Sequence, residues 1–263
     1  MKKPTFISES FEVDFNNNGY IIIKNFLNKE ELNKVFKELN NVYDKNYIQK
    51  VGMWNSLYNL SKEEGIIISE FLLELLKPKL KMIVKDFKVL VATFMVKNPN
   101  KNSASELHKD FFIDESKFEY RNFWIPLVDI NYENEMLYVI PKSHKVFNYP
   151  QPMFVKWPYK SIEETIMKQA VNVMASAGDL VVYADRTLHG SYINYSKEAR
   201  PVIHFGALHT DANLSYYKLN SETNKVSVFD VPFSFYFENR FELVGELYEE
   251  KRNFEFLPPS ITL

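Results

Sequence analysis

The feature that most constrains the fold is a series of short apolar segments in the middle of the chain. These segments are rich in β-branched and aromatic residues and are separated by Asn, Pro, Ser and Gly. They read VLVATFMVK, YRNFWIPLVDI, MLYVI, QAVNVMA, DLVVYA and RPVIHFGAL, and they lie between residues 89 and 208. Short strands without alternating helices favour a sandwich or a barrel. We therefore expect a mainly β fold with flanking helices, a double-stranded β-helix (jelly roll, cupin-like).

Helical patterns precede these segments. After a short strand at 21–23, Asn28 and Glu31 form a capping-box pattern ahead of an apolar helical face. A second helix is predicted to start at Ser61, with Glu64 three residues on, and to end or begin another turn at Pro78. Helices are therefore expected at the front of the chain.

The chain of 263 residues is 46% hydrophobic, which is enough for a sizeable core. Because it has no repeat, low-complexity tract or Gly/Ser linker, we expect a single domain over 1–263. We expect a helical N-terminal part at about 1–88, the jelly-roll core at about 89–210, and a cover of strand and helix at 211–263. The turns AGDL and HGS are expected to need their glycines.

Charge and cysteine usage limit the partners. A formal net charge of −2 gives no electrostatic footprint for nucleic acid or an anionic membrane surface. The chain has no cysteine, so any metal must be held by nitrogen and oxygen ligands, and a reducing compartment is favoured. No apolar signal-peptide region follows the two N-terminal lysines. We expect a cytoplasmic protein that acts on a small molecule, without nucleic-acid or membrane partners; the primary substrate and the oligomeric state stay open.

The stretch SELHKDFFID carries a histidine and a carboxylate on one predicted strand. Side chains two residues apart on a strand share a face, so His108 and Asp110 can share one ion; the plainer interpretation is a surface hydrogen-bonded pair. His189 closes the segment DLVVYADRTLH, and Arg200 follows eleven residues later. We expect a hairpin that sets His189 and Arg200 on neighbouring strands facing the interior. Two histidines and one carboxylate are typical of a ferrous site with open positions.

The order of these motifs resembles the phytanoyl-CoA dioxygenase family of Fe(II)/2-oxoglutarate oxygenases over roughly residues 12–206. The similarity lies in HxD, WIPLVDINYENEMLYVIPKSH, AGDLVVYADRTLHGSYIN and Arg200, with NNNGYIIIKNFLNKEEL and MVKNP before them. Two positions depart from the family pattern. Glu135 stands where the family usually has the glycine of Asn-Gly, and Lys142 stands where it has a glycine before Ser-His. Both changes fall in turns, so we expect them to change the loop shape and the choice of substrate more than the iron site.

The resemblance implies roles for individual residues. His108, Asp110 and His189 would bind Fe(2+), and Arg200 would hold the far carboxylate of 2-oxoglutarate through its bidentate donors. Family members also place residues matching Lys97, Trp124 and Ser191 around the co-substrate. Plainer interpretations of these three are a solvated strand-end charge, a core aromatic and a turn hydroxyl. His144 matches a family position but is expected to be structural, and His204 and His209 are expected in the core or on the surface.

The resemblance also implies a reaction. Halogenating family members replace the acid of the HxD motif by a small residue, so Asp110 favours hydroxylation. The expected reaction uses O2 to hydroxylate an unactivated C–H of a small metabolite, lipid or natural product, with release of succinate and CO2. Desaturation, epimerisation and ring formation are other outcomes. The alternative class is a cupin-like isomerase using Zn, Mn or Ni, or a non-catalytic ligand-binding jelly roll; Arg200 argues against a plain binding module.

Substrate-contacting residues are harder to predict from the sequence. Phe111, Phe112, Tyr138 and Tyr183 are aromatic candidates for the mouth of the jelly roll, but in a chain with 22 Phe and 16 Tyr the core interpretation is favoured for them. Arg121 and Arg186 are candidates to meet an anionic group of the substrate or to face water.

Overall fold

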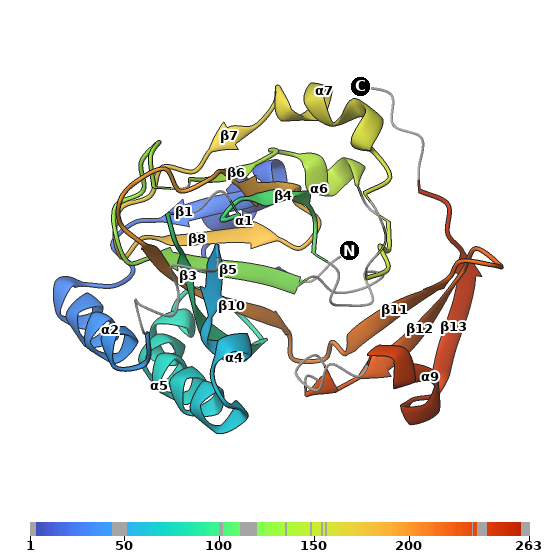
Figure 1. Cartoon of the computed structure of the whole chain (residues 1–263), viewed down its shortest axis with the longest axis horizontal. Helices are drawn as coiled ribbons and strands as arrows, with labels where there is room; N and C mark the ends of the chain where they lie inside the picture. The colour runs from blue at the N-terminus through green and yellow to red at the C-terminus, as the bar shows by residue number, and fades with distance from the viewer. Residues whose placement is uncertain are drawn as a thin grey trace.

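The computed structural model describes residues 4–43, 52–99, 102–110, 120–134, 136–147, 149–153, 155, 157–232, 234–235 and 241–258. A six-stranded sheet forms its centre (Figure 1). Its order is β1 (Tyr20–Ile23), β8 (Leu180–Ala184), β5 (Tyr120–Pro126), β10 (Arg200–His209), β3 (Phe87–Lys97) and β2 (Met53–Asn55). All its pairs are antiparallel, and most of the paired strands are distant in the sequence.

A four-stranded sheet faces this major sheet. Its order is β4 (Ser105–His108), β9 (His189–Ser191), β6 (Leu137–Val139) and β7 (Val171–Asn172). Trp124, Val181 and Val202 of the major sheet pack against Leu137 and Val139 of this minor sheet in one apolar cluster. Burial of these apolar side chains between two facing sheets is what holds a jelly roll together. The predicted jelly-roll fold is therefore confirmed.

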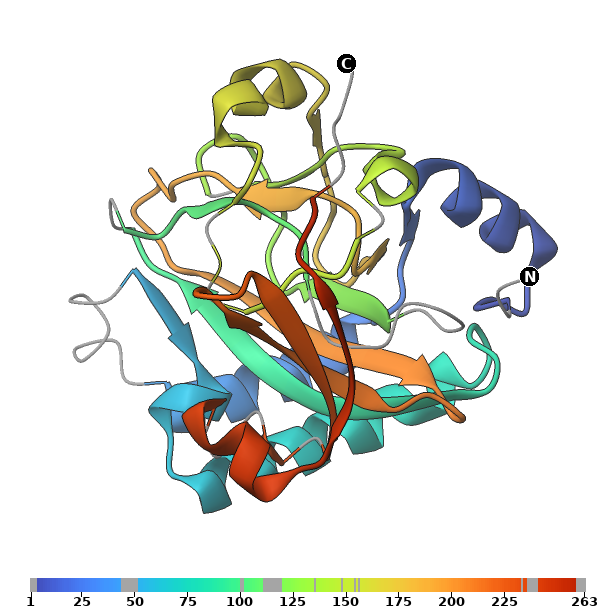
Figure 2. The ribbon, with the colours of Figure 1, turned by 90° about the vertical axis from the view of Figure 1, so that its right-hand side faces the viewer.

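Helices cover the other face of the major sheet. α2 (Lys29–Val42) and α5 (Lys62–Leu80) lie below it in Figures 1 and 2, and their apolar faces join its outward side chains in the largest cluster. Both predicted capping boxes form, at Asn28 with Glu31 and at Ser61 with Glu64, and Pro78 lies inside the end of α5. α4 (Ser56–Asn59) precedes α5.

Some elements differ from the expectation. An unpredicted helix, α1 (Glu9–Asn18), begins after the N-cap Ser8 and ends at Gly19, which adopts φ +82°. Two short helices, α6 (Ser143–Val146) and α7 (Glu163–Met167), lie beyond the minor sheet. The segment QAVNVMA forms only the two-residue strand β7.

A third sheet occupies the described part of residues 211–263. It is an antiparallel meander of β11 (Leu214–Asn220), β12 (Lys225–Val231) and β13 (Glu250–Glu255), with the short helix α9 (Val244–Leu247). Figures 1 and 2 show it at one end of the molecule. Its core includes Tyr120 and Leu208 from the ends of β5 and β10. The cover expected at 211–263 as a strand and a helix is therefore mainly a three-stranded sheet. The mixed apolar pattern of this region did not indicate the sheet.

The two expected glycine turns have different outcomes. Gly178 adopts φ +85°, a conformation that L side chains rarely take, in the turn before β8. Gly190 lies in strand β9 instead of a turn. A Cβ there would stand 2.2 Å from the Tyr138 hydroxyl, so close packing of the minor sheet requires this glycine.

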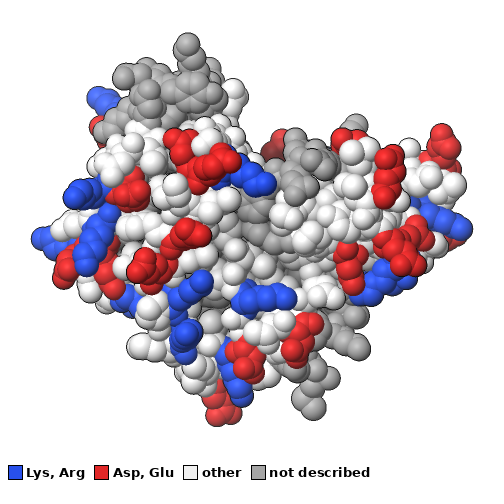
Figure 3. All heavy atoms as spheres, turned by 90° about the horizontal axis from the view of Figure 1, so that it is seen from below, with Lys and Arg blue, Asp and Glu red and all other residues white. Residues whose placement is uncertain are grey.

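The surface gives two further observations. On the face in Figure 3, acidic and basic side chains are interspersed, and neither kind forms a continuous patch. Within the described ranges, every helix is too short or too polar to cross a bilayer.

Candidate metal centre

One cavity between the two sheets is lined by all seven residues that the sequence analysis placed in the site. Its volume is about 170 Å³. The seven are Lys97, His108, Asp110, Trp124, His189, Ser191 and Arg200, and the lining also includes Met95, Ser105, Leu137, Tyr183, Gly190 and His204. The structure therefore brings together residues from five strands of two sheets and from the segment after β4.

Three of these residues form a group with metal-binding geometry. His108 and His189 are directly opposite each other in the β4–β9 pair, with ring centroids 4.2 Å apart. Asp110 follows β4 by two residues, and its two oxygens lie 4.0 Å from His108 Nε2 and 3.7 Å from His189 Nε2. One ligand atom from each residue falls within 4.8 Å of the others. Two imidazoles and one carboxylate on one side of a point suit a divalent transition metal such as ferrous iron.

Backbone and amide groups orient these side chains. The Nδ1 atoms of His108 and His189 bond the carbonyl oxygens of Glu106 and Thr187, at 2.7 and 2.9 Å, which leaves each Nε2 for the cavity. The Asn122 side-chain amide donates to Asp110 Oδ2 at 2.6 Å. The Asp110 N–H donates to the Asp185 carbonyl at 2.8 Å, which fixes the backbone where β4 ends.

The electrostatics also fit a metal. Burial, and then the neighbouring His108, hold the pKa of His189 well below its ordinary value, so its ring is neutral at neutral pH. Burial raises the pKa of Asp110, against the opposing effects of His108, His204 and the Asn122 hydrogen bond. A neutral imidazole can bind a cation without first losing a proton, and a desolvated carboxylate is stabilised by the cation. The donor set is therefore compatible with one divalent ion.

The structure corrects two expectations about His189. It begins strand β9, because the segment at 185–188 turns away after β8. His189 and Arg200 consequently lie on different sheets, β9 pairing with β4 and β6, and β10 with β3 and β5. The loop between them crosses from one sheet to the other, which loop length alone could not distinguish from a hairpin. Both residues still line the same cavity, as expected.

Two buried cations lie at the end of the cavity formed by β3 and β10. Arg200 and Lys97 are opposite each other in the register and are each 3% exposed. The Arg200 guanidinium lies 5.3 Å from the Trp124 ring centroid. The Lys97 ammonium donates to the Ser103 carbonyl and to the hydroxyls of Ser105 and Ser191, at 2.9 and 3.0 Å for the hydroxyls.

The sequence analysis missed several residues that line or support the site, and two of them lie close to the metal-binding group. His204 lines the cavity, although it was expected in the core or on the surface, and Asn122 holds Asp110. Both were detectable from strand periodicity, because Asn122 is two residues from Trp124 and His204 is four from Arg200. His144, by contrast, bonds the Asn16 carbonyl, and His209 accepts from the Asp211 N–H; neither lines the cavity.

Among the described candidates for substrate contact, only Tyr183 lines the cavity. Tyr138 packs in a cluster on the other side of the minor sheet. Arg121 donates to the Thr5 hydroxyl and lies over the Phe15 ring, so it faces the helical layer. Arg186 is buried next to Asp185 and does not line the cavity. Phe111, Phe112 and Glu135 lie outside the described residues.

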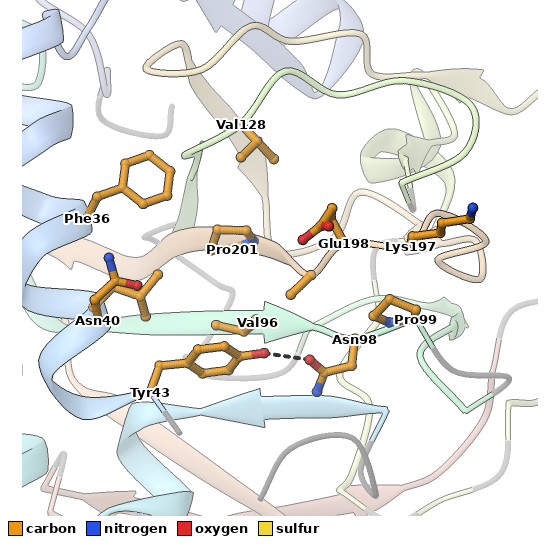
Figure 4. Close-up of a pocket in the computed structure, with 12 residues that line it drawn as sticks. Phe36, Asn40, Tyr43, Val96, Asn98, Pro99, Val128, Lys197, Glu198 and Pro201 are labelled. Carbon is orange, nitrogen blue, oxygen red and sulfur yellow. Dashed lines mark hydrogen bonds between the residues drawn. The ribbon is translucent and has the colours of Figure 1, made fainter. Parts of the chain in front are cut away.

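A larger cavity of about 710 Å³ lies on the outer side of β3 and β10 (Figure 4). Helix α2 lines one side of this cavity with Phe36 and Asn40, and Tyr43 follows directly after the helix. The Tyr43 hydroxyl donates to the Asn98 side chain at 2.6 Å. None of the seven expected site residues lines it. The larger cavity is therefore separate from the candidate metal centre.

Comparison with known proteins identifies the group to which these features belong. The family model described as phytanoyl-CoA dioxygenase (PhyH) matches residues 15–202, most of the chain. A search of curated proteins gave no match.

Several solved structures share the fold. One is a non-heme alpha ketoglutarate dependent carbocyclase, SnoK, from nogalamycin biosynthesis, with 18% identity and a TM-score of 0.60 over 81% of this chain and 89% of that one. Another is the epimerase SnoN in complex with Fe3+, alpha ketoglutarate and nogalamycin RO, with 17% identity and a TM-score of 0.56 over 78% and 85%. A third is HygX from Streptomyces hygroscopicus with nickel, 2-oxoglutarate and hygromycin B bound, with 16% identity and a TM-score of 0.56 over 76% and 87%.

Proposed function

Because this chain belongs to the phytanoyl-CoA dioxygenase (PhyH) family of Fe(II)/2-oxoglutarate-dependent enzymes, we propose that it hydroxylates an unactivated C–H bond of a small metabolite, lipid or natural product. The observation that carries the proposal is the pairing of two features in one cavity. A His108–Asp110–His189 group lies within 4.8 Å, and the buried cations Arg200 and Lys97 line the same space. A jelly roll that only binds a metal has no need for two buried cations beside it. A dianionic co-substrate needs them, because their positive charge stabilises its carboxylates.

Each residue has a specific task in this proposal. His108, Asp110 and His189 hold ferrous iron, and Asn122 keeps the Asp110 carboxylate in its orientation. When bound, iron with 2-oxoglutarate and O2 supplies the oxidation of the C–H bond, and succinate and CO2 are released. Arg200 binds the far carboxylate of 2-oxoglutarate and sets its register. Trp124, which lies beside Arg200, excludes water from that contact.

Lys97 has a different task from Arg200. Its ammonium already donates to one carbonyl and two hydroxyls, which are as many partners as it has N–H bonds. We assign it a positioning role, in which it holds the Ser191 and Ser105 hydroxyls at the end of the cavity formed by β3 and β10 and adds positive charge there. Ser191 can then accept from Lys97 and donate its own proton to the co-substrate carboxylate.

The outcome of the oxidation is the finer part of the proposal. Asp110 occupies the position that halogenating family members leave vacant, which favours hydroxylation over halogenation. Two structural neighbours are described as a carbocyclase and an epimerase, so oxidation without oxygen insertion is the second candidate. The two differ in product, because only hydroxylation transfers an oxygen atom from O2 to the substrate.

The proposal extends to the organisation and location of the chain. The single-domain division at about 1–88, 89–210 and 211–263 stays a prediction, as does a cytoplasmic location, which the lack of cysteine favours. A small-molecule substrate is supported by the neighbours described with nogalamycin RO and hygromycin B.

The test is co-substrate consumption. The purified protein is loaded with Fe(II) without oxygen, mixed with 2-oxoglutarate and exposed to air, and succinate is measured over time. We expect slow succinate formation that needs both iron and 2-oxoglutarate, and none with Asp110→Ala. A protein that binds zinc tightly and never consumes 2-oxoglutarate would support the cupin-like alternative instead.

A further inference from the structure

The strand that carries Arg200 presents a second polar side chain to the cavity. On β10, Arg200, Val202, His204 and Gly206 share one face because side chains alternate along a strand. Val202 is buried in the apolar cluster between the sheets, and the hydroxyl of Tyr120 fills the space beside Gly206, where a Cβ would stand 1.5 Å from it. His204 is therefore the last side chain of β10 to face the cavity before Tyr120 closes it.

His204 is too far along the strand to serve the same carboxylate as Arg200. Four residues of an antiparallel strand span about 13 Å. In the register, Arg200 is paired with Lys97, whereas His204 is paired with Thr93 and Trp124. Asp110 and His189 both influence the pKa of His204, so its ring lies near the metal ligands, away from Lys97.

The ring of His204 differs from those of the other four histidines in its hydrogen bonding. His108, His144, His189 and His209 each engage a backbone group through a ring nitrogen. Within the described part of the chain, no hydrogen bond involves the His204 ring; Thr93 bonds only its backbone carbonyl. The residue is half-buried, so the ring meets the cavity without a protein partner.

The ring is also uncharged at neutral pH. Burial lowers the pKa of His204 to about 4, although Asp110 acts in the opposite direction. A neutral imidazole offers one N–H donor and one nitrogen acceptor. Such a ring can donate to a carbonyl oxygen, or either donate to or accept from a hydroxyl. It gives a carboxylate no positive charge to pair with.

The side chains around His204 indicate the polarity and the size of the group that can bind beside it. Met95, Trp124, Leu137 and Tyr183 give the cavity apolar and aromatic walls. Burial raises the pKa of Tyr183 well above its ordinary value, and Asp110 and Tyr120 add to this, so its hydroxyl stays neutral. A volume of about 170 Å³ is below the roughly 300–1,000 Å³ of pockets that enclose a drug-sized ligand. With 2-oxoglutarate present, only the reacting end of a substrate fits inside.

We propose that His204 is a specificity-determining residue, which binds a hydroxyl or carbonyl group next to the reacting carbon of an otherwise apolar, uncharged substrate. This inference rests on the proposed function, since it assigns the space beyond the co-substrate to the primary substrate. His204 orients the reacting end by one hydrogen bond, and the walls from Met95, Trp124 and Leu137 bury the adjoining apolar surface.

The test compares three small probes that differ in one group: benzyl alcohol, toluene and benzoate. Each is titrated without oxygen into the complex of the protein with Fe(II) and 2-oxoglutarate, and binding is followed by the visible absorption of that complex. We expect the wild type to bind benzyl alcohol roughly 3- to 10-fold more tightly than toluene, as one neutral hydrogen bond allows. Benzoate should bind most weakly at this position.

Variants assign the preference to His204. His204→Phe should bind both neutral probes about equally, and His204→Gln should recover part of the preference for the alcohol. His209→Asn is the matched control on the same strand, outside the cavity, and should keep the wild-type preference. Iron content and the 2-oxoglutarate dissociation constant, measured on the same samples, should not change in any of these variants.

The outcomes separate this inference from the proposed function. Failure of the wild type to form the complex with iron and 2-oxoglutarate overturns both. A complex that forms but shows no preference for the alcohol, prefers benzoate, or keeps its preference in His204→Phe overturns only the role of His204.

Discussion

The two walls of the cavity are built in different ways. The wall from the major sheet carries Arg200 and Lys97 at the start of a long regular pairing between β10 and β3, interrupted only between Phe205 and Ala207. The wall from the minor sheet carries the metal-binding group on β4 and β9, which pair at Ser105 with Ser191 and at His108 with His189, with a register shift between. One wall is thus fixed by continuous sheet hydrogen bonds and the other by a few individual contacts.

Exposure follows this division only in part, because His189 on the minor-sheet wall is 5% exposed and so is nearly as buried as the two cations. Arg200 and Lys97 are each 3% exposed, whereas the His108 side chain is 42% exposed and the Asp110 side chain 16%. An anion anchor gains strength from desolvation, because charges attract more strongly away from water. A metal centre needs an accessible side, because a co-substrate and O2 must reach it. We therefore expect single substitutions on the minor-sheet wall to affect metal binding and those on the major-sheet wall to affect co-substrate binding.

The largest effect is expected on the minor-sheet wall, from Asp110→Ala. This change removes the one anionic ligand, so turnover should fall below detection. The loss should exceed the roughly 10- to 100-fold seen when a residue that orients a metal ligand is changed. Asp110→Glu should do little better, because the longer side chain displaces the oxygens from the position set by β4 and Asn122. Succinate formation and iron content are the measurements.

Glu106→Gln is the matched control for Asp110, since Glu106 supplies only its backbone carbonyl to His108. Unchanged turnover in Asp110→Ala would mean that Glu106, or Asp114 outside the described residues, is the ligand.

The next effect is expected on the other wall, from Arg200→Ala. Loss of a bidentate, charge-assisted contact in a desolvated pocket should weaken 2-oxoglutarate binding by on the order of 2 to 4 kcal/mol, or roughly 30- to 1000-fold. Iron affinity should stay nearly intact, and Arg200→Lys should recover only part of the loss. The measurement is the anaerobic dissociation constant of 2-oxoglutarate.

Arg252→Ala is a matched control for Arg200, because Arg252 also lies 5.3 Å from an aromatic ring centroid, that of Phe254, but on exposed β13. An unchanged dissociation constant in Arg200→Ala would remove Arg200 from the site and leave Lys97 as the carboxylate partner.

The contact that joins the two walls gives a smaller effect. Asn122 on β5 of the major sheet donates directly to Asp110, so Asn122→Ala should free the carboxylate without removing it. Iron affinity should fall roughly 10- to 100-fold, less than for Asp110→Ala. Titration of iron under anaerobic conditions measures this, with Asn253→Ala on β13 as the same truncation at an exposed site. Equal iron affinity in wild type and Asn122→Ala would show that the walls act independently.

The smallest effect concerns the turn before α6, beside the minor sheet. Lys142 adopts φ +66°, a left-handed conformation that costs an L residue about 1–2 kcal/mol. Lys142→Gly relieves this strain but increases the entropy of the unfolded chain, so we expect a gain of up to about 1 kcal/mol in the free energy of unfolding. Denaturant unfolding measures it, with Lys145→Gly inside α6 expected to destabilise. A loss of stability in Lys142→Gly would contradict the strain.

Local patterns in the sequence predicted the elements that depend on near neighbours. The capping boxes at Asn28 and Ser61 involve groups three residues apart, and both form as expected. The central strands followed from alternation and from β-branched content, which also depend on neighbouring residues. The helix α1 was missed, because its weakly amphipathic sequence carries little periodic signal.

The sequence by itself determined which residue types are available and in what order: a histidine and an acid, then a second histidine, then an arginine, with the jelly-roll strands that carry them. Only the tertiary structure decided that His189 and Arg200 lie on opposite sheets, that Asn122 reaches Asp110, and that His204 meets the cavity without a partner. Strand pairing and register are set by contacts between residues far apart in the chain, and a segment's own pattern does not specify its partner. The candidate ligands were therefore predictable, and the side chains that surround them were not.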